Sequence, residues 1–585
     1  MKRTVSKATL ANWERLGSED KQLIHRANKT ESLRKIFPDK YISNKNNKSK
    51  ILAIADWIVT QQMDSSAAIC GLALQAVYSS PHVSAANQDR FYQAAVQVCP
   101  HLPKIPADEA WQIDLTEPDF LGALYQTLQA EGARNKNGLY YTPAFVADRL
   151  LGQLEFTADD YILDPAVGTG IFLCELVRRF GVPVAQVHGT DIDPVAVLLA
   201  TANLLLQAPA NDNTYPDLRV CDYLQSQPVA AKRPDVVVGN PPWGAKKLAH
   251  VLHSELGRAD SFAYFIEKSL ADLADSGTLA FVLPVSLLNI ATHEPVRQLL
   301  LAKSAIATIT KLPRLFQGVV SDVCLLVVRK TADAVDADVK FEQEEQRLVM
   351  PQAAFARMPH HNFLPLRTDD RQILHHIWQQ EHDTLAHSTW GLGIVTGNNG
   401  KYVVPASTDS DQQVEPLITG KEIHPYVVDE PQRYLKFERA NFQQVALDEI
   451  YRAPEKLVYK FINNRLIFAY DDQQRLTLNS ANILLPNVAT HSLRTVLAYL
   501  NSELFQYLNQ ILFASSKVLR GNLEQLPFVK LSVSERVQLE ELVDSRLAGT
   551  SSMTAEIDNF VFAKYRLSPA AIARIKQVLA SDVFA

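Results

Sequence analysis

The sequence predicts an α/β protein built on a Rossmann-like, doubly wound sheet, with a helical region before the sheet and a mixed α+β domain after it. Three observations support this fold class. Short apolar runs alternate with helical patterns from about residue 136 onward. Several of these runs end at a polar residue. The chain has 585 residues, which is too long for one core and indicates three or four domains.

The first 48 residues are expected to form a small basic helical unit. Residues 1–50 hold 13 Lys and Arg against 5 Asp and Glu, a balance of 13 − 5 = +8, in a chain whose net charge is −6. The segment from Val5 to Gly17 resembles the start of a helix-turn-helix, with Ser6 as the helix cap. A DNA contact and a solvated basic tail both explain the charge, and an ordinary amphipathic helix explains the pattern nearly as well.

Residues 49–135 are expected to be helical. Apolar residues recur there at helical spacing, in one set from Ile51 to Val59 and in another from Ala67 to Val77. No residue pattern in this region indicates chemistry.

Six short apolar runs are the expected strands of the sheet, which we assign to a domain spanning residues 136–335. They are Tyr161–Leu163, Val184–His188, Leu218–Val220, Val236–Val238, Leu279–Leu283 and Val323–Val328. The first four end at or near Asp164, Asp191, Asp222 and Asn240. Parallel strands bring such residues to one edge, where doubly wound sheets bind their ligands. We therefore expect the functional site at this edge.

Three segments are expected after the sheet. Residues 336–388 are charged and predict a connector. Residues 389–533 contain short strands and turns, with one turn cluster at Thr396–Gly400, and predict a mixed α+β domain. Residues 534–585 return to a helical pattern and predict a helical tail.

The composition is that of an ordinary soluble protein, with 47% hydrophobic and 21% charged residues. No apolar run reaches the ~18 residues that span a bilayer, and no apolar segment at the N-terminus predicts secretion. The five cysteines are scattered and form no Cys-x-x-Cys pair, which disfavours a zinc site and suits the reducing cytoplasm. The sequence therefore predicts a cytoplasmic protein without a metal site or a membrane segment.

The loop Asp164–Phe172 follows one expected strand and opens an expected helix. Gly168 and Gly170 allow a tight turn and a close approach of the backbone to a ligand. A dinucleotide-binding loop would have glycine at the position of Leu173, and no Gly-Lys-Ser/Thr follows to form a phosphate loop. The loop therefore suits a neutral or zwitterionic ligand better than a pyrophosphate.

The second strand is expected to supply an acid for a ribose. Asp191 comes 21 positions after Gly170, and a carboxylate there can accept from both ribose hydroxyls. A helix cap is the alternative role, but Asp193 fits the cap better because Pro194 would then occupy the first helical turn.

The third strand is expected to supply contacts to an adenine ring. Asp222 is placed to accept a hydrogen bond from an adenine amino group. Either Tyr223 or Ile192 is expected to pack on the face of the ring. Each acid alone would more often be a cap or a surface residue, but the order and spacing of the three favour a cofactor pocket.

The tetrapeptide Asn240-Pro241-Pro242-Trp243 directly follows the fourth strand and predicts methyl transfer to an aromatic amine. Such an amine is a poor nucleophile because its lone pair is delocalised into the ring. The side-chain oxygen of Asn240 and the carbonyl of Pro241 can accept its two hydrogens and localise the lone pair, while the prolines keep both acceptors in place. Trp243 can stack on the base. A simple proline-rich turn is the alternative, which the place of the tetrapeptide in the fold disfavours.

A base inside a duplex must be flipped out to reach such a pocket. The segment Leu312–Gly318 supplies Phe316 as a second aromatic wall for the flipped base. A role as a core aromatic is the alternative for Phe316.

These motifs together resemble the gamma-class amino-methyltransferases, in particular TaqI-type adenine-N6 DNA methyltransferases and the methyltransferase part of type IIG restriction enzymes. Gly138–Pro143 looks like the family's leading motif, in which Thr142 would contact the methionine end of the cofactor. The resemblance implies S-adenosylmethionine as the cofactor. Its implied contacts are Tyr141, Thr142, Pro143, Asp164, Pro165, Ala166, Gly168, Gly170, Asp191, Ile192, Asp222, Tyr223 and Asn240.

The C-terminal region also resembles the TaqI-type specificity domain, through segments such as Leu417–Tyr426, Lys456–Phe461 and Leu523–Pro527. The resemblance implies double-stranded DNA as the partner, read through groove contacts and positioned through phosphate contacts. The candidate DNA contacts are Lys421, Lys456, Lys460 and Arg520.

The chain departs from the family in two respects. Position 243 is Trp instead of the commoner Tyr, and residues 1–135 lack the Asp…Glu-x-Lys cluster of a type IIG nuclease. We therefore expect modification of adenine N6 without cleavage, by a monomer that acts with a separate restriction endonuclease or with none. Methylation of cytosine N4 is the alternative within this chemistry. Asn-Pro-Pro enzymes that act on RNA or protein glutamine, and a catalytically silent DNA-binding regulator, are the others.

Overall fold

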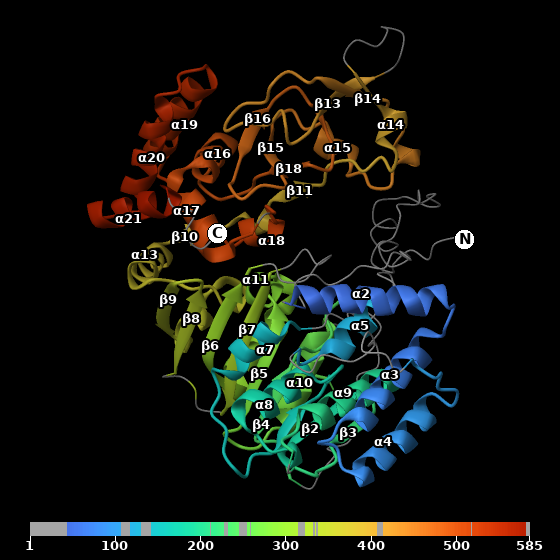
Figure 1. Ribbon diagram of the computed structural model, residues 1–585. Coiled ribbons are helices and arrows are strands. Elements are labelled where there is room, and N and C mark those ends of the chain that lie inside the picture. The colour runs from blue at the N-terminus through green and yellow to red at the C-terminus, as the bar shows by residue number, and fades with distance from the viewer. Residues whose placement is uncertain are drawn as a thin grey trace. The chain divides into compact units, whose positions relative to one another are not determined.

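The computed structural model describes residues 42, 44–106, 117–129, 142–210, 212–226, 232–244, 254–257, 259–313, 322–331, 334, 337–405, 414–515 and 517–580. The described residues form two compact units, which divide between Pro365 and Leu366. Figure 1 shows the helices and strands of both units. The expected helix-turn-helix of residues 1–48 lies almost entirely outside the described residues.

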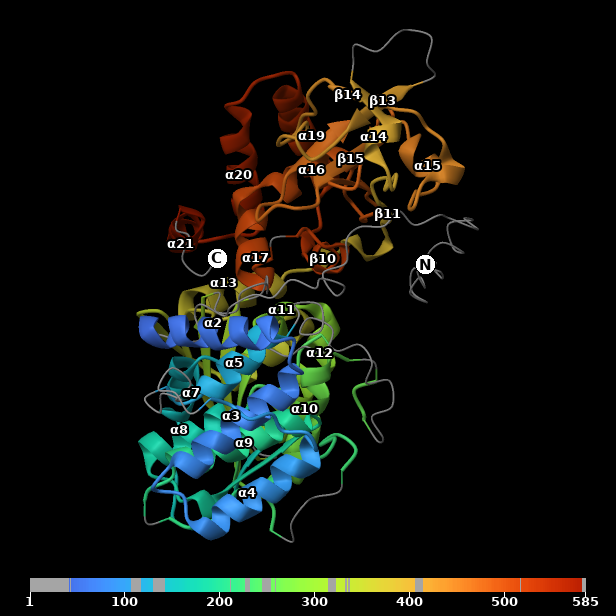
Figure 2. The same ribbon diagram turned by 45° about the vertical axis from the view of Figure 1, so that its right-hand side comes forward.

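The first unit begins with helices α2 (Lys45–Thr60), α3 (Ser65–Ser79), α4 (Ala85–Val98) and α5 (Phe120–Leu128). Their apolar faces share one hydrophobic core with α9 (Pro194–Gln207), and Figure 2 shows α3 and α4 beside that helix. Side chains start the helices: Asp64 caps α3 by accepting from the backbone N–H of Ala67 at 2.8 Å. The described part of the expected helical region therefore packs on the sheet domain instead of forming a core of its own.

A nine-stranded sheet forms the centre of the first unit, in the order β3-β2-β1-β4-β5-β7-β6-β8-β9. Strands β3, β2, β1, β4 and β5 run parallel to one another, and β7 is antiparallel to both β5 and β6. The strands are β1 (Ile162–Asp164), β2 (Val187–Asp191), β3 (Asp217–Val220), β4 (Val236–Gly239), β5 (Thr278–Pro284), β6 (Ser304–Leu312), β7 (Val323–Lys330), β8 (Asp338–Gln343) and β9 (Gln346–Pro351).

Helices connect these strands and cover the sheet, as in a doubly wound fold. They are α7 (Ala144–Leu151), α8 (Ile171–Phe180), α9, α10 (Ser261–Asp272), α11 (Ser286–Asn289) and α12 (Glu294–Lys303), with short 3₁₀ turns at Val184–Gln186, Ala291–His293, Gln352–Arg357 and Pro359–His361. The fold class is confirmed, and each of the six expected strands overlaps an observed strand. The expected strand Val184–His188 is misplaced at its start, because Val184–Gln186 forms a 3₁₀ turn and β2 begins at Val187.

Three strands were not expected, and their burial explains why. In β6, isoleucines and a leucine are separated by Ala, Thr and Lys, so no continuous apolar run marks the strand. Strands β8 and β9 form an edge hairpin in which buried side chains such as Val339, Phe341 and Met350 alternate with exposed polar ones. This alternation made the segment look like a charged connector. The expected connector 336–388 is therefore divided: its first part extends the sheet, and residues from Leu366 onward belong to the other unit.

The second unit is mixed α+β, as expected. Its two four-stranded sheets have the orders β11-β18-β15-β16 and β12-β14-β13-β17, and β10 pairs with β19. The strands are β10 (His382–Asp383), β11 (Thr389–Gly391), β12 (Val403–Pro405), β13 (Glu415–Ile418), β14 (Arg433–Leu435), β15 (Lys456–Lys460), β16 (Phe468–Asp471), β17 (Leu476–Thr477), β18 (Ala481–Leu485) and β19 (Phe528–Val529). Residues from both four-stranded sheets meet in one hydrophobic core.

Helices surround the sheets of this unit. They are α13 (Thr368–Trp378), α14 (Asn399–Tyr402), α15 (Asp448–Tyr451), α16 (Leu493–Asn501), α17 (Glu503–Phe513), α18 (Arg520–Leu523), α19 (Val533–Leu547), α20 (Met553–Lys564) and α21 (Pro569–Ala580), with 3₁₀ turns at Leu385–His387 and Arg439–Asn441. Helices α16, α17 and α20 bring Tyr499, Phe505 and Tyr565 together around Phe528 of β19 in an aromatic cluster. The helical tail is thus packed into this unit.

Candidate active site

The loop after β1 has the backbone shape that its glycines allow. Gly168 and Gly170 have φ of +53° and +92°, in the left-handed region that other residues rarely adopt. A Cβ atom on Gly170 would lie 3.1 Å from the Cβ of Ala200 on α9, so the loop also approaches that helix closely. The backbone N–H of Gly168 donates to the carboxylate of Asp191 at 2.9 Å. The loop after β1 is therefore bonded directly to the end of β2.

Asp164, the last residue of β1, is a fully buried carboxylate with one unsatisfied oxygen. Its Oδ1 accepts from the backbone N–H of Ala166 at 3.0 Å, whereas Oδ2 has no hydrogen-bond partner among the described residues. Burial raises the pKa of Asp164 to about 8, and the nearby charge of Asp191 adds to this effect. A buried acceptor of this kind fits the ammonium group of an amino acid, which S-adenosylmethionine carries.

Asp191 is held at the end of β2 by two backbone donors. Oδ1 accepts from the N–H of Asp193 at 3.0 Å and Oδ2 from that of Gly168 at 2.9 Å, and each carboxylate oxygen keeps a second acceptor site. Burial raises the pKa of Asp191, while these donors oppose the shift. The expected division of roles holds at the cap: Asp193 accepts from the N–H of Val195 at 3.0 Å, and Pro194 follows it in the first turn of α9.

The two expected candidates for an adenine face differ sharply in exposure. The side chain of Ile192 beside Asp191 is 69% exposed, so it offers an apolar surface. Tyr223 is only 4% exposed, its hydroxyl donates to Asp272 of α10 at 3.0 Å, and its ring stacks on Phe265. Tyr223 is therefore a packing residue of the core, which corrects its expected role as a cofactor contact.

Asp222 stabilises the turn after β3. Its Oδ1 accepts from the N–H of Leu224 at 3.0 Å and its Oδ2 from the amide of Gln225 at 2.8 Å. Both oxygens keep a further acceptor site, so a contact to an adenine amino group stays a prediction.

The expected catalytic tetrapeptide begins directly after β4, beside the end of β1. A Cβ atom on Gly239, whose φ is +149°, would lie 2.6 Å from Oδ1 of Asp164, so a larger residue at this position would have to displace the buried carboxylate. The amide nitrogen of Asn240 donates to the hydroxyl of Thr142 at 3.0 Å. This bond joins the predicted leading motif, just before α7, to the catalytic loop.

The rest of the loop is fixed by its surroundings. Pro241 is buried, and Trp243 is 8% exposed. The carbonyl of Pro242 accepts from the hydroxyl of Ser261, and the N–H of Gly244 donates to Asp260 at 2.7 Å. Two members of the expected site, Tyr141 and Phe316, lie outside the described residues.

A buried network that has no signature in the sequence supports the glycine loop after β1. Asp119, 1% exposed, accepts from the N–H of Gly122 at 2.9 Å, the hydroxyl of Thr169 at 2.5 Å and the amide of Asn203 at 2.8 Å. Asn203 also donates to the carbonyl of Thr169 at 2.9 Å. The loop is thereby tied to α5 and α9, which lie 50 and 34 residues away in sequence.

Among the expected DNA contacts, the prediction for Lys456 is wrong. Its side chain is fully buried, pairs with the equally buried Asp471 at 2.7 Å and donates to the carbonyl of Tyr451 at 2.7 Å. Arg475 contacts the same carboxylate at 3.2 Å. Lys456 therefore belongs to a buried ion cluster and cannot reach a phosphate.

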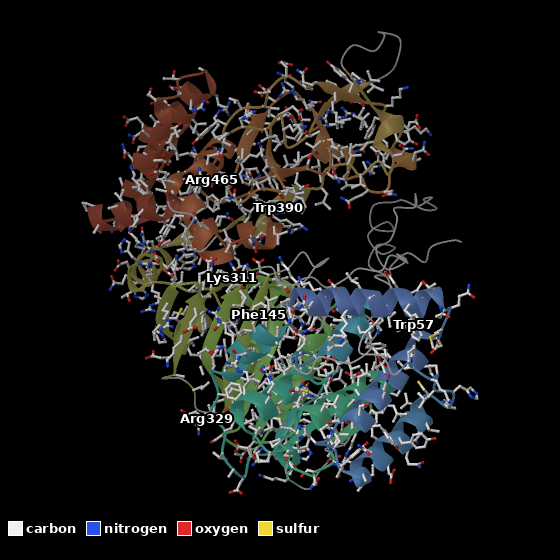
Figure 3. The ribbon with its side chains drawn as sticks, viewed as in Figure 1. Trp57, Phe145, Lys311, Arg329, Trp390 and Arg465 are labelled. Carbon is white, nitrogen blue, oxygen red and sulfur yellow. The ribbon has the colours of Figure 1, made fainter. Side chains whose placement is uncertain are left out.

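The other three candidates keep some access to solvent. Lys421 is exposed, and Lys460 at the end of β15 is half-buried. Arg520 is exposed, pairs with Glu524 at 2.7 Å and lies 6.0 Å from the ring centre of Trp390, which Figure 3 labels. These three cations stay candidate DNA contacts.

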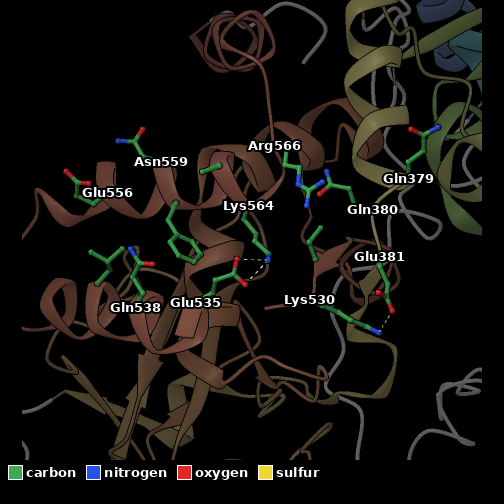
Figure 4. Close-up of a pocket in the computed structure, with 14 residues that line it drawn as sticks. Gln379, Gln380, Glu381, Lys530, Glu535, Gln538, Glu556, Asn559, Lys564 and Arg566 are labelled. Carbon is green, nitrogen blue, oxygen red and sulfur yellow. Dashed lines mark hydrogen bonds and ion pairs between the residues drawn. The ribbon is translucent and has the colours of Figure 1, made fainter. Parts of the chain in front are cut away.

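The second unit also contains a cavity of about 790 Å³, lined by residues of α19, α20 and the segment after α13 (Figure 4). Two of its cations are neutralised, Lys530 by Glu381 at 2.5 Å and Lys564 by Glu535 at 2.8 Å. The lining of the cavity therefore carries charges of both signs that largely cancel.

Within the described ranges, no cluster of His, Cys, Asp and Glu could hold a metal ion. No described helix is both long and apolar enough to cross a membrane.

The doubly wound sheet with its glycine loop after β1 is a methyltransferase fold, and the match of the chain to the N-6 DNA methylases makes S-adenosylmethionine its methyl donor. Residues 116–389 match the family model of the N-6 DNA methylases, and residues 415–528 match that of the TaqI-like C-terminal specificity domain. The Type II methyltransferase M.VspI of Vibrio sp. (strain 343) is 32% identical over 300 residues, which cover 49% of this chain and 72% of that protein. The chain belongs to the N-6 DNA methylases with a TaqI-like specificity domain, and is a DNA adenine methyltransferase.

Two further proteins show how far the similarity extends. The modification methylase CviBIII of Paramecium bursaria Chlorella virus NC1A is 28% identical over 174 residues, which cover 29% of this chain and 43% of that protein. The Type IIL restriction-modification enzyme MmeI, whose structure contains DNA, has a similar fold with a TM-score of 0.61 at 13% identity. That similarity covers 92% of this chain and 98% of the MmeI chain.

Proposed function

We propose that this chain is the modification enzyme of a restriction-modification system and that it methylates N6 of an adenine flipped out of double-stranded DNA. The observation that carries the proposal is the Asn240–Trp243 loop, which follows β4 beside the buried Asp164 of β1. The matched specificity domain and the modification methylases among the relatives support DNA as the substrate.

The cofactor supplies a methyl group already activated on a sulfonium sulfur. We assign its ammonium group to Asp164 and its ribose hydroxyls to Asp191. Ile192 offers an apolar surface for the adenine ring, and Asp222 an acceptor for its amino group. The glycine backbone of the loop at 168–170 lets the cofactor approach closely.

The chain's own residues prepare the target amine for attack. The bond from its amide nitrogen to Thr142 fixes the side chain of Asn240, whose oxygen then accepts one hydrogen of the amine. The carbonyl of Pro241 accepts the other. Methyl transfer would leave the amine cationic, and it would then lose one of these two hydrogens as a proton to solvent while the two acceptors hold the amine in place. Trp243 stacks on the flipped base.

The cellular setting is part of the same proposal. One chain carries both a catalytic loop and a specificity domain, which supports action as a monomer on duplex DNA, with cleavage left to a separate endonuclease. The five free cysteines suit the cytoplasm, where its DNA substrate lies. Light scattering of the purified chain with and without duplex DNA tests the oligomeric state.

Long-read sequencing of DNA from cells that express the protein tests the central claim. Methyladenine at one defined motif, absent from cells that express Asn240→Ala, is the expected result. Methylcytosine at that motif, or DNA without any modification, would contradict the proposal.

A further inference from the structure

The catalytic loop is held from outside by the first residues of α10. Ser261, the first residue of that helix, is 0% exposed, and its hydroxyl donates to the carbonyl of Pro242. Asp260 precedes it and accepts from the N–H of Gly244 at 2.7 Å. The two bonds bracket Trp243 and begin directly after Pro241. We propose that Ser261 and Asp260 are positioning residues that set the geometry of methyl transfer, an inference that rests on the proposed function.

The conformation of Asp260 is the first argument. It occupies the N-cap of α10 with extended backbone angles, φ −74° and ψ 153°, yet its side chain makes no capping bond to the helix. Asp usually accepts from an N–H of its own helix at this position, which stabilises the helix. Here the carboxylate accepts instead from Gly244, which has a φ of +72°. The carboxylate of Asp260 therefore binds the loop instead of capping its own helix.

The direction of the carbonyl groups is the second argument. The proposed chemistry needs the carbonyl of Pro241 to face the target amine. The next carbonyl, that of Pro242, is bound to Ser261 and cannot compete for the amine or rotate freely. Proline fixes φ, and Pro242 also restricts ψ of the preceding Pro241, but ψ of Pro242 itself stays free, so the bond to Ser261 supplies a restraint that the two prolines lack.

The rigidity of α10 is the third argument. The segment before the helix is fixed by Tyr264, whose hydroxyl accepts from the N–H of Ala259 at 2.9 Å and donates to the carbonyl of Gly257 at 2.6 Å. Farther along α10, Asp272 accepts from Tyr223, which follows the predicted adenine contact Asp222. One buried helix thus joins the turn after β3 to the catalytic loop after β4.

The test uses the full-length enzyme and single-turnover methyl transfer to a duplex that contains its target site. Ser261→Ala and Asp260→Ala are expected to lower the rate constant roughly tenfold to a hundredfold, since small displacements of reacting groups cost that much. The dissociation constant for S-adenosylmethionine should stay within about twofold of the wild type. Asp260→Asn keeps an acceptor oxygen and is expected to restore most of the rate.

Ser304→Ala is the matched control. Ser304 is also 0% exposed, and its hydroxyl also donates to a backbone carbonyl, that of Leu300 at 2.7 Å, but it lies on β6. It should lower the melting temperature about as much as Ser261→Ala while leaving the rate constant within about twofold of the wild type. A rate constant of Ser261→Ala and Asp260→Ala that equals the wild type, or an equal fall in Ser304→Ala, would overturn the inference.

Hydrogen exchange separates the two levels of the proposal. Ser261 and Asp260 together form the proposed clamp on the catalytic loop. Loss of either residue should speed exchange of the Trp243 and Gly244 amides, and Ser304→Ala should not. This readout needs no turnover, so it tests the clamp even if the wild type methylates no adenine, which would refute the proposed function. Unchanged exchange in both clamp variants would overturn the clamp itself.

Discussion

Replacing Asp164 with Asn should remove a pH dependence from cofactor binding. Burial raises the pKa of Asp164 to about 8, so its carboxylate is mostly protonated in the free enzyme at neutral pH. A pKa of 8 gives an ionised fraction of about 1% at pH 6 and about 24% at pH 7.5. If the ammonium group of the cofactor binds this carboxylate, affinity should rise about 20-fold over that interval, which equals about 1.8 kcal/mol.

Calorimetric titration of S-adenosylmethionine between pH 6 and pH 7.5 measures this slope. The α-amino group of the ligand, with a pKa of about 7.7–8.0, is still about two-thirds protonated at pH 7.5, so its own titration lowers the expected rise only slightly. Asp164→Asn should bind more weakly at pH 7.5 and show little slope. Asp159→Asn, the same change at an exposed position, should retain the slope of the wild type. An equal slope in Asp164→Asn, or none in the wild type, would refute the assignment of the ammonium site.

The same group should affect the stability of the enzyme without cofactor. Its folded-state pKa lies above its unfolded value, so the stability that it contributes is present at low pH and is lost as pH rises from about 4 through about 8. Asp164→Asn lacks this loss and should melt at a higher temperature than the wild type at pH 8.5. A melting temperature below that of the wild type at this pH would contradict the burial argument.

Three further changes test other parts of the site. Asn240→Ala should slow single-turnover methylation by about 100- to 1,000-fold, the cost of removing one preorganised polar group, with cofactor affinity within about threefold; a change in affinity alone would contradict its role. Asp191→Ala should weaken cofactor binding about tenfold or more in titrations but leave DNA binding unchanged, and equal losses would mean that the ribose assignment is wrong. Lys456→Ala should lower the free energy of unfolding by about 3–5 kcal/mol because Asp471 loses its buried partner. Lys421→Ala should leave the stability unchanged. It should reduce the slope of log affinity for DNA against log salt concentration by about one, the value for one lost phosphate contact. A Lys456→Ala variant that is as stable as the wild type but binds DNA more weakly would show that Lys456 contacts DNA after all.

The sequence was informative where strands are buried on both faces. Runs such as Val236–Val238 and Val323–Val328 are continuous because both faces of the sheet are covered, and the structure places both as strands. It was misleading at the edge, where β8 and β9 alternate buried and exposed residues and carry charge on the open face. A segment of that kind resembles a connector unless its pairing partner is known.

A similar limit explains the errors among the site residues. Lys456 and Tyr223 carry side chains suited to binding, but each has partners that are distant in sequence or in an adjacent element. Asp471 neutralises Lys456 from the neighbouring strand, and α10 engages the hydroxyl of Tyr223. Residue type indicates what a side chain can do, whereas burial decides whether it is free to do it.

The residues proposed to carry out the reaction lie in short sequence motifs, whereas the residues that hold them in place are distant in sequence. Asp164 and Asn240 stand at the ends of neighbouring strands, so a short motif at each strand end is enough to predict them. Their supports come from elsewhere: Asp119 reaches Thr169 across 50 residues, and Ser261 reaches Pro242 across 19. A loop stiffened by prolines still needs these external bonds, because proline restrains only one of its own two backbone angles. The short motifs therefore specify the reaction, and the long-range hydrogen bonds supply the geometry that the reaction requires.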